Sequence, residues 1–100
     1  MKFLKEHLSH ENYEWELGNR LQKMKDMTPT RNQFDRINGY CILHMLNLFD
    51  ELVVTLTIRE GQRLELLIAN ELPLETNSEM AVFNWLKMKY IYLFPAKTLN

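Results

Sequence analysis

The central part of the chain carries a cysteine and a histidine at a spacing that suits a catalytic nucleophile and its base. Cys41 and His44 stand three residues apart, so on a helix they share a face, as a nucleophilic thiolate and its base would. A reactive cysteine needs solvent access and an electropositive setting, whereas Cys41 is embedded among Ile42, Leu43 and Met45. The pattern therefore favours a buried structural thiol and a core or boundary imidazole.

Four potential metal ligands lie near the start of the chain. They are His7, His10, Glu11 and Glu14, at spacings of three, one and three. Imidazole and carboxylate ligands suit zinc or manganese. The spacing is not the HExxH pattern, however, and charged residues at a chain start are usually solvated. We therefore expect no metal site here.

Paired acids are the third candidate for chemistry. They occur at Glu11, Glu14 and Glu16 and again at Asp50 and Glu51. Neither group has a second cluster of catalytic residue types that would complete an acid/base site. The chain has no GxGxxG, GxxxxGK[ST] or GxSxG motif, and its 3 glycines leave little material for a phosphate-binding loop. We expect no catalytic residues, no cofactor and no enzyme activity.

Lysines and aromatic residues alternate near the C-terminus. Lys87 and Lys89 stand among Trp85, Tyr90 and Tyr92, an arrangement found in proteins that bind single-stranded nucleic acid. The whole chain has 12 Lys and Arg against 13 Asp and Glu, so it has no basic excess to neutralise phosphates. Nucleic-acid binding through Lys87 and Lys89 is the alternative hypothesis.

The composition of the same region is typical of a surface that binds another protein. Residues 82–94 hold more large apolar groups than one terminal element of a 100-residue domain readily buries, unless the core is unusually large. Aromatic residues and methionine are enriched at protein interfaces. The leading hypothesis is a small non-enzymatic adaptor, inhibitor or regulator that binds another protein or itself. The expected contacts are Trp85, Tyr90, Tyr92, Phe94, Thr55, Thr57 and Leu67.

Length and composition indicate one compact domain over residues 1–100, with 46% hydrophobic and 25% charged residues. A single cysteine excludes an intramolecular disulfide and favours a reducing cytoplasm. The longest apolar run, from Tyr40 to Phe49, is interrupted by polar residues and is far shorter than the ~20 residues of a membrane span. The first residues lack the apolar run of a signal peptide.

A β-hairpin is expected in the middle of the chain. Leu52, Val54, Leu56 and Ile58 alternate before Gly61, and a second alternating set follows it, which predicts strands at about 52–58 and 63–69. Its outer face would carry Thr55, Thr57 and Leu67. An extended helix through Leu52 and Leu56 competes with the first strand.

Helices are expected on both sides of this hairpin. Apolar spacing predicts one over residues 10–27 and another from about 31 to 51, the latter with Phe34, Ile37, Cys41, Leu48 and Leu52 inward. The nearly uniformly apolar stretch 41–49 indicates a central, enclosed helix. Asn38-Gly39 is either a kink in this second helix or its boundary.

The last elements complete the expected fold. Ser78 is a plausible N-cap for a C-terminal helix through Met80, Phe83, Leu86 and Lys87, and residues 89–94 could form a third strand. The expected fold class is α+β: two N-terminal helices, a central antiparallel β-hairpin, and a C-terminal helix that continues through residues 89–94 or is followed there by a third strand.

Overall fold

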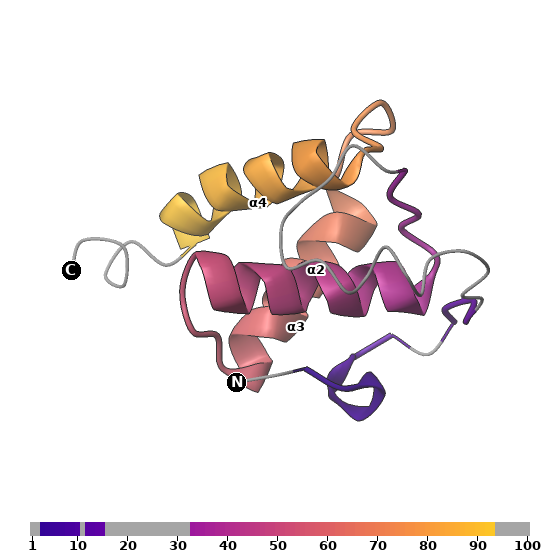
Figure 1. Cartoon of the computed structure of the whole chain (residues 1–100), viewed down its shortest axis with the longest axis horizontal. Coiled ribbons are helices and arrows are strands. Elements are labelled where there is room, and N and C mark those ends of the chain that lie inside the picture. The colour runs from indigo at the N-terminus through magenta and orange to yellow at the C-terminus, as the bar shows by residue number, and fades with distance from the viewer. Residues whose placement is uncertain (1–2, 11, 16–32, 94–100) are drawn as a thin grey trace.

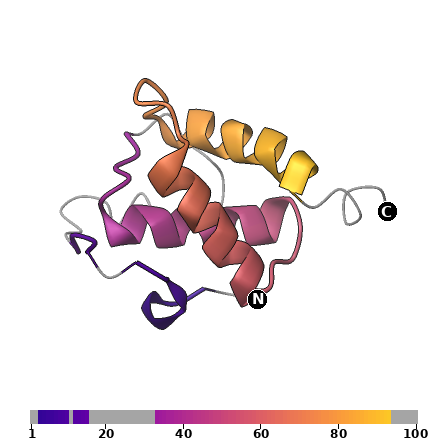
Figure 2. The same cartoon turned by 180° about the vertical axis from the view of Figure 1, so that it is seen from behind.

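The structure is a computed structural model that describes residues 3–10, 12–15 and 33–93 of the chain. For residues 92 and 93 it describes the backbone but not the side chains. The elements of this part are a 3-10 turn, η1 (Lys5–His7), and the helices α2 (Gly39–Leu52), α3 (Ile58–Asn70) and α4 (Glu79–Leu93). In Figure 1, α2 lies in the middle, with α4 on one side and the N-terminal segment on the other. Figure 2, from behind, shows α3 crossing α2.

The predicted β-hairpin is wrong, because both of its strands belong to helices or to the connection between them. Residues 52–58 include the end of α2 and the start of α3, and residues 63–69 lie inside α3. The described part contains no strand, only the isolated bridges Glu14–Asn38 and Gln33–Ser78. This part of the protein is therefore mainly helical rather than α+β.

Two local features explain why α3 is a helix. Leu64, Leu67 and Ile68 are buried, and they recur at the spacing of a helix rather than that of a strand. Its first turn is closed by a capping box, in which the Thr57 hydroxyl accepts from the N–H of Glu60 (3.1 Å) and the Glu60 carboxylate accepts from the N–H of Thr57 (2.9 Å). Val53, Val54 and Thr55, whose β-branched side chains suit a strand, lie in the connection before this box.

Asn38-Gly39 is a helix boundary rather than a kink. The Asn38 side chain caps α2 by accepting from the N–H groups of Tyr40 (2.9 Å) and Cys41 (3.3 Å). Residues 33–38 are not helical, so the predicted helix over 31–51 begins too early. Ile37 and Leu52, which we expected inward, are exposed.

The helix predicted over residues 10–27 does not form at residues 10 and 12–15, where no helix is present. The remainder of that prediction lies outside the described residues.

The C-terminal helix begins after Ser78, as expected. The Ser78 hydroxyl accepts from the N–H of Ala81 at 3.2 Å. The possible third strand over 89–94 does not form at residues 89–93, which continue α4, and Phe94 lies outside the described residues. In the described part, no helix is long and apolar enough to cross a membrane.

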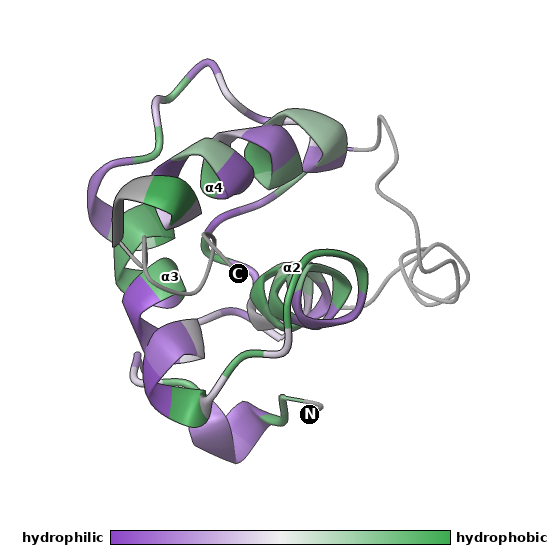
Figure 3. Cartoon of the chain, turned by 90° about the vertical axis from the view of Figure 1, so that its left-hand side faces the viewer, coloured by the Kyte–Doolittle hydropathy of each residue, from purple (hydrophilic) through white to green (hydrophobic). Residues whose placement is uncertain are grey.

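The core surrounds α2, which confirms the enclosed helix predicted from its apolar residues. Every residue from Gly39 to Asp50 is buried or half-buried, and α2 packs against both α3 and α4. The ring of Phe49 lies 6.0 Å from that of Phe83 and 5.3 Å from that of Tyr90, centroid to centroid. Figure 3, which looks nearly along α2, shows apolar residues on the helix faces that meet here.

The N-terminal segment completes this core from the side opposite α4. Phe3 is buried, and its ring packs directly on Gly61 of α3. A Cβ at position 61 would overlap the ring atoms Cε1 and Cζ, so glycine is required here by close approach rather than by a turn. The residue that marked the centre of the predicted hairpin thus receives the N-terminal segment.

We predict that Gly61→Ala destabilises the protein while Phe3 is present and stabilises it once the ring is removed. In the wild-type background, overpacking costs about 1–3 kcal/mol. In a Phe3→Ala background, the helix propensity of alanine contributes about 1 kcal/mol instead. Urea denaturation of the four proteins measures both changes. Stabilisation by Gly61→Ala in both backgrounds would show that Phe3 does not pack on Gly61.

Candidate functional site

Helix α4 is apolar around most of its circumference. Val82, Phe83, Leu86 and Tyr90 are buried against the rest of the molecule. The opposite side carries Met80, Met88 and Ile91, which are 40%, 64% and 56% exposed. We name Met80, Asn84, Met88 and Ile91 the α4 outer face, because their spacing places them in one row along the helix.

Two features shape the α4 outer face. A hollow of about 380 Å³, lined by Ser78, Met80, Ala81 and Asn84, lies at its start. Lys87 borders the row on one side, and Trp85 with Lys89 borders it on the other, as follows from 100° per residue. The row is therefore apolar except for Asn84 in its middle, and one lysine lies beyond each of its sides, Lys89 on the far side of Trp85.

The two lysines of the alternative hypothesis do not form a track for phosphates. Lys87 Nζ lies 5.8 Å from the ring centroid of Phe83, and Lys89 Nζ lies 5.6 Å from that of Trp85. Each ammonium group thus stays near an aromatic ring of its own helix. Because the lysines lie on different edges, the structure does not bring them together.

The other residues expected to contact a partner are scattered. Trp85 is half-buried, and Tyr90 is only 1% exposed, so its ring belongs to the core. Thr55 and Thr57 are exposed, in the α2–α3 connection and at the α3 N-cap rather than on a sheet. The Tyr92 side chain and Phe94 lie outside the described residues.

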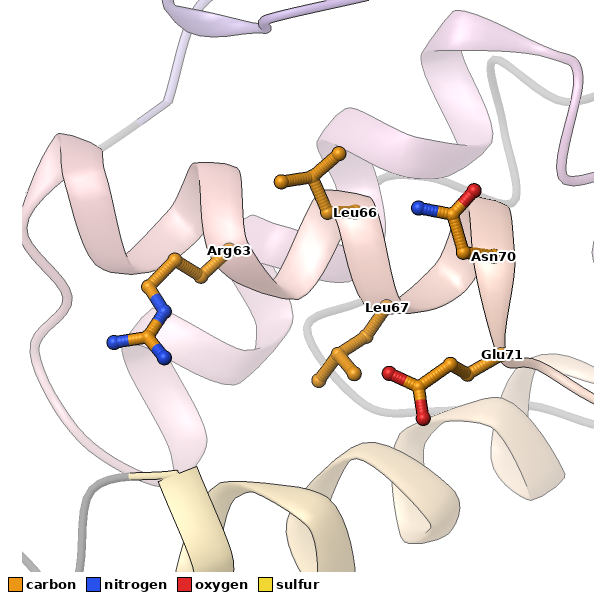
Figure 4. A pocket seen from close by; sticks show the side chains of 5 residues that line it. All are labelled: Arg63, Leu66, Leu67, Asn70 and Glu71. Atoms are coloured by element: carbon orange, nitrogen blue, oxygen red, sulfur yellow. The ribbon is translucent and has the colours of Figure 1, made fainter.

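Leu67 faces a pocket of about 210 Å³ on α3. The pocket is lined by Arg63, Leu66, Leu67, Asn70 and Glu71. Figure 4 shows Arg63, Leu67 and Glu71 on the side of α3 that faces α4, whereas Leu66 and Asn70 point away. Because Leu67 is buried and belongs to the hydrophobic core, we assign it to internal packing rather than to a partner surface.

The most densely bonded polar group among the described residues is the carboxylate of Glu65. It is fully buried, and its oxygen atoms accept from the Ser9 N–H (2.8 Å), the Ser9 hydroxyl (2.9 Å), the His10 N–H (3.2 Å) and the Tyr13 hydroxyl (2.5 Å). These donors make burial of a carboxylate tolerable. The strand predicted over residues 63–69 gave Glu65 no such role.

A pocket of about 170 Å³ lies beside these hydrogen bonds. It is lined by His10, Asn12, Tyr13, Arg36, Ile37 and Ala69. The Arg36 guanidinium donates to the carbonyls of Leu72 (2.7 Å) and Pro73 (2.9 Å), which ties residues 33–38 to the loop after α3. The Nε2 atom of His10 is buried and has no hydrogen-bond partner in the described part of the chain.

The candidate chemical groups of the sequence lie in two regions, on α2 and in the N-terminal segment. Cys41 is buried, and His44 Nε2 lies 3.8 Å from a carboxylate oxygen of Glu79 at the start of α4. Of the four N-terminal ligand candidates, Glu11 lies outside the described residues. Within those residues, no group of three or more His, Cys, Asp and Glu is placed to hold a metal ion.

Three comparisons were made with known proteins. No protein-family model matches the chain, and neither the curated proteins nor the solved structures contain a significant match.

We predict that stability falls above pH 10 through Tyr13. Burial, with the hydrogen bond and the charge of Glu65, raises the pKa of the Tyr13 hydroxyl above its ordinary value of 10.0. The folded state therefore keeps a proton that the unfolded chain loses, so stability is intact below pH 10 and declines above it. Urea denaturation at pH 9, 10 and 11 should show a steeper decline for wild type than for Tyr13→Phe. Equal declines would contradict the buried hydrogen bond.

Proposed function

We propose that the protein is a small non-enzymatic protein-binding module, an adaptor, inhibitor or regulator, that binds its partner through the α4 outer face. The observation that carries this proposal is the exposure of Met80, Met88 and Ile91 in one row, on a helix whose other side already belongs to the core. Rows of exposed apolar side chains with polar edges are typical of protein interfaces, and methionine adapts to varied partner surfaces.

The charges at the edges specify the chemistry of the partner. Lys87 and Lys89 border an apolar row, so the complementary surface is apolar along its middle and acidic at its edges. A partner helix that carries an apolar stripe between carboxylates would fit the α4 outer face. The side chains of this face stand about one turn apart, and rows of this kind interlock with the side chains of a second helix. The proposal includes a cytoplasmic location, which the single buried Cys41 supports.

We predict that Met88→Glu abolishes partner binding and leaves the fold intact. Met88 is 64% exposed on a helix, so glutamate there costs little folding free energy but introduces a charge into the apolar row and repels acidic edges. The measurement is the amount of companion protein that co-purifies with tagged wild type and variant, together with the melting temperature of each.

Leu74→Glu is the matched control, because Leu74 is 86% exposed in the loop before α4 and the change of charge is the same. Retention of the companion by Leu74→Glu and its loss by Met88→Glu would support the proposal. Equal retention by both variants would refute it. Co-purifying material that nuclease digests, and whose binding falls steeply as the salt concentration rises, would instead favour nucleic-acid binding through Lys87 and Lys89.

A further inference from the structure

Residues 3–10 are held against α2 and α3 largely through their own backbone. Asn47 of α2 makes two hydrogen bonds to Phe3: its Oδ1 accepts from the Phe3 N–H (2.6 Å) and its Nδ2 donates to the Phe3 carbonyl (3.2 Å). Gln62 of α3 donates to the carbonyl of His7 at 2.8 Å. Hydrogen bonds to main-chain atoms do not depend on the side chains of the segment that is bound.

The far end of the segment is held in the same way. Glu65 accepts from the backbone N–H groups of Ser9 and His10, and the Ser9 hydroxyl adds a third donor to the same carboxylate. Helical side chains from two different elements thus pair with main-chain groups at both ends of one non-helical stretch.

One side chain of the segment is strongly selected. The Phe3 ring is buried and packs on Gly61, where the missing Cβ of the helix leaves space for an aromatic ring. We name Asn47, Gly61, Gln62 and Glu65 the peptide groove. Three of its members bind backbone and one admits a ring, which is how grooves that recognise peptides combine affinity with selectivity.

We propose that the peptide groove also binds a segment of a partner protein, with an aromatic residue on Gly61 and a serine six positions later, and that residues 3–10 occupy it as an exchangeable internal ligand. Residues 3–10 and α4 lie on opposite sides of α2, so this proposal concerns a different part of the molecule from the one above (Figure 1). Because the internal segment is covalently tethered, its local concentration is high and it competes with external peptide.

The experiment removes the internal ligand without shortening the chain. The probe is a fluorescein-labelled peptide with the sequence of residues 1–10, and fluorescence anisotropy measures its binding to full-length wild type and to Phe3→Ala. We expect the variant to bind the probe at least about tenfold more tightly, because its own segment no longer fills the space on Gly61. A probe with alanine at its third position should bind the variant weakly.

The matched control is Phe3→Ala combined with Gly61→Ala. The added methyl group fills the space for the ring without disturbing the helix, so the probe should bind this protein weakly while far-UV circular dichroism stays equal to that of Phe3→Ala. Equal probe affinity for the single and the double variant, or for wild type and Phe3→Ala, would overturn the proposal.

A second measurement keeps the test decisive if Phe3→Ala does not fold. Isotope-labelled wild type is titrated with unlabelled probe, and the NMR signal of the protein's own Phe3 amide is followed. Displacement of the segment moves this signal, and the alanine probe leaves it in place. A Phe3 signal that does not move at saturating probe would overturn the proposal.

Discussion

The structure depends on the enclosure of α2. Every residue from Gly39 to Asp50 is buried or half-buried, so apolar groups on nearly all sides of this helix have to be removed from water. One packed helix covers only one stripe of another, so a single neighbour is not enough. In the described part, α3, α4 and the N-terminal segment share this task (Figures 1 and 2). In each of these neighbours, the residues that pack against α2 determine which of its other residues face solvent.

Covering a helix with a non-helical segment creates a second constraint, because backbone groups without regular partners must still be paired. Asn47, Gln62 and Glu65 meet this need with side chains that bond to the main chain of residues 3–10. The Glu65 carboxylate in turn is buried only because it receives several donors at once. The same contacts that finish the core define the groove proposed to accept another peptide.

Helix α4 carries more apolar surface than α2 and α3 can cover. Its inner residues complete the core, and Met80, Met88 and Ile91 remain on the outer side. The two proposed binding surfaces are therefore different results of the same packing: one is a helix face that has no neighbour among the described residues, and the other is a site already filled by the chain itself. They belong to different parts of the molecule, because residues 3–10 and α4 lie on opposite sides of α2 (Figure 1).

The sequence by itself determined the central helix and the helix that starts after Ser78, because uniform apolar character and an N-cap are local signals. It predicted strands where α3 forms, because the apolar residues there alternate as they do in a strand, and the capping box at Thr57 was the local signal against a hairpin. Only the tertiary structure decided which aromatic and apolar residues of α4 are exposed, and that Gly61 and Glu65 receive the N-terminal segment. The roles of Gly61 and Glu65 depend on residues of the N-terminal segment that lie more than 50 positions away in the chain, and no local sequence pattern encodes such contacts.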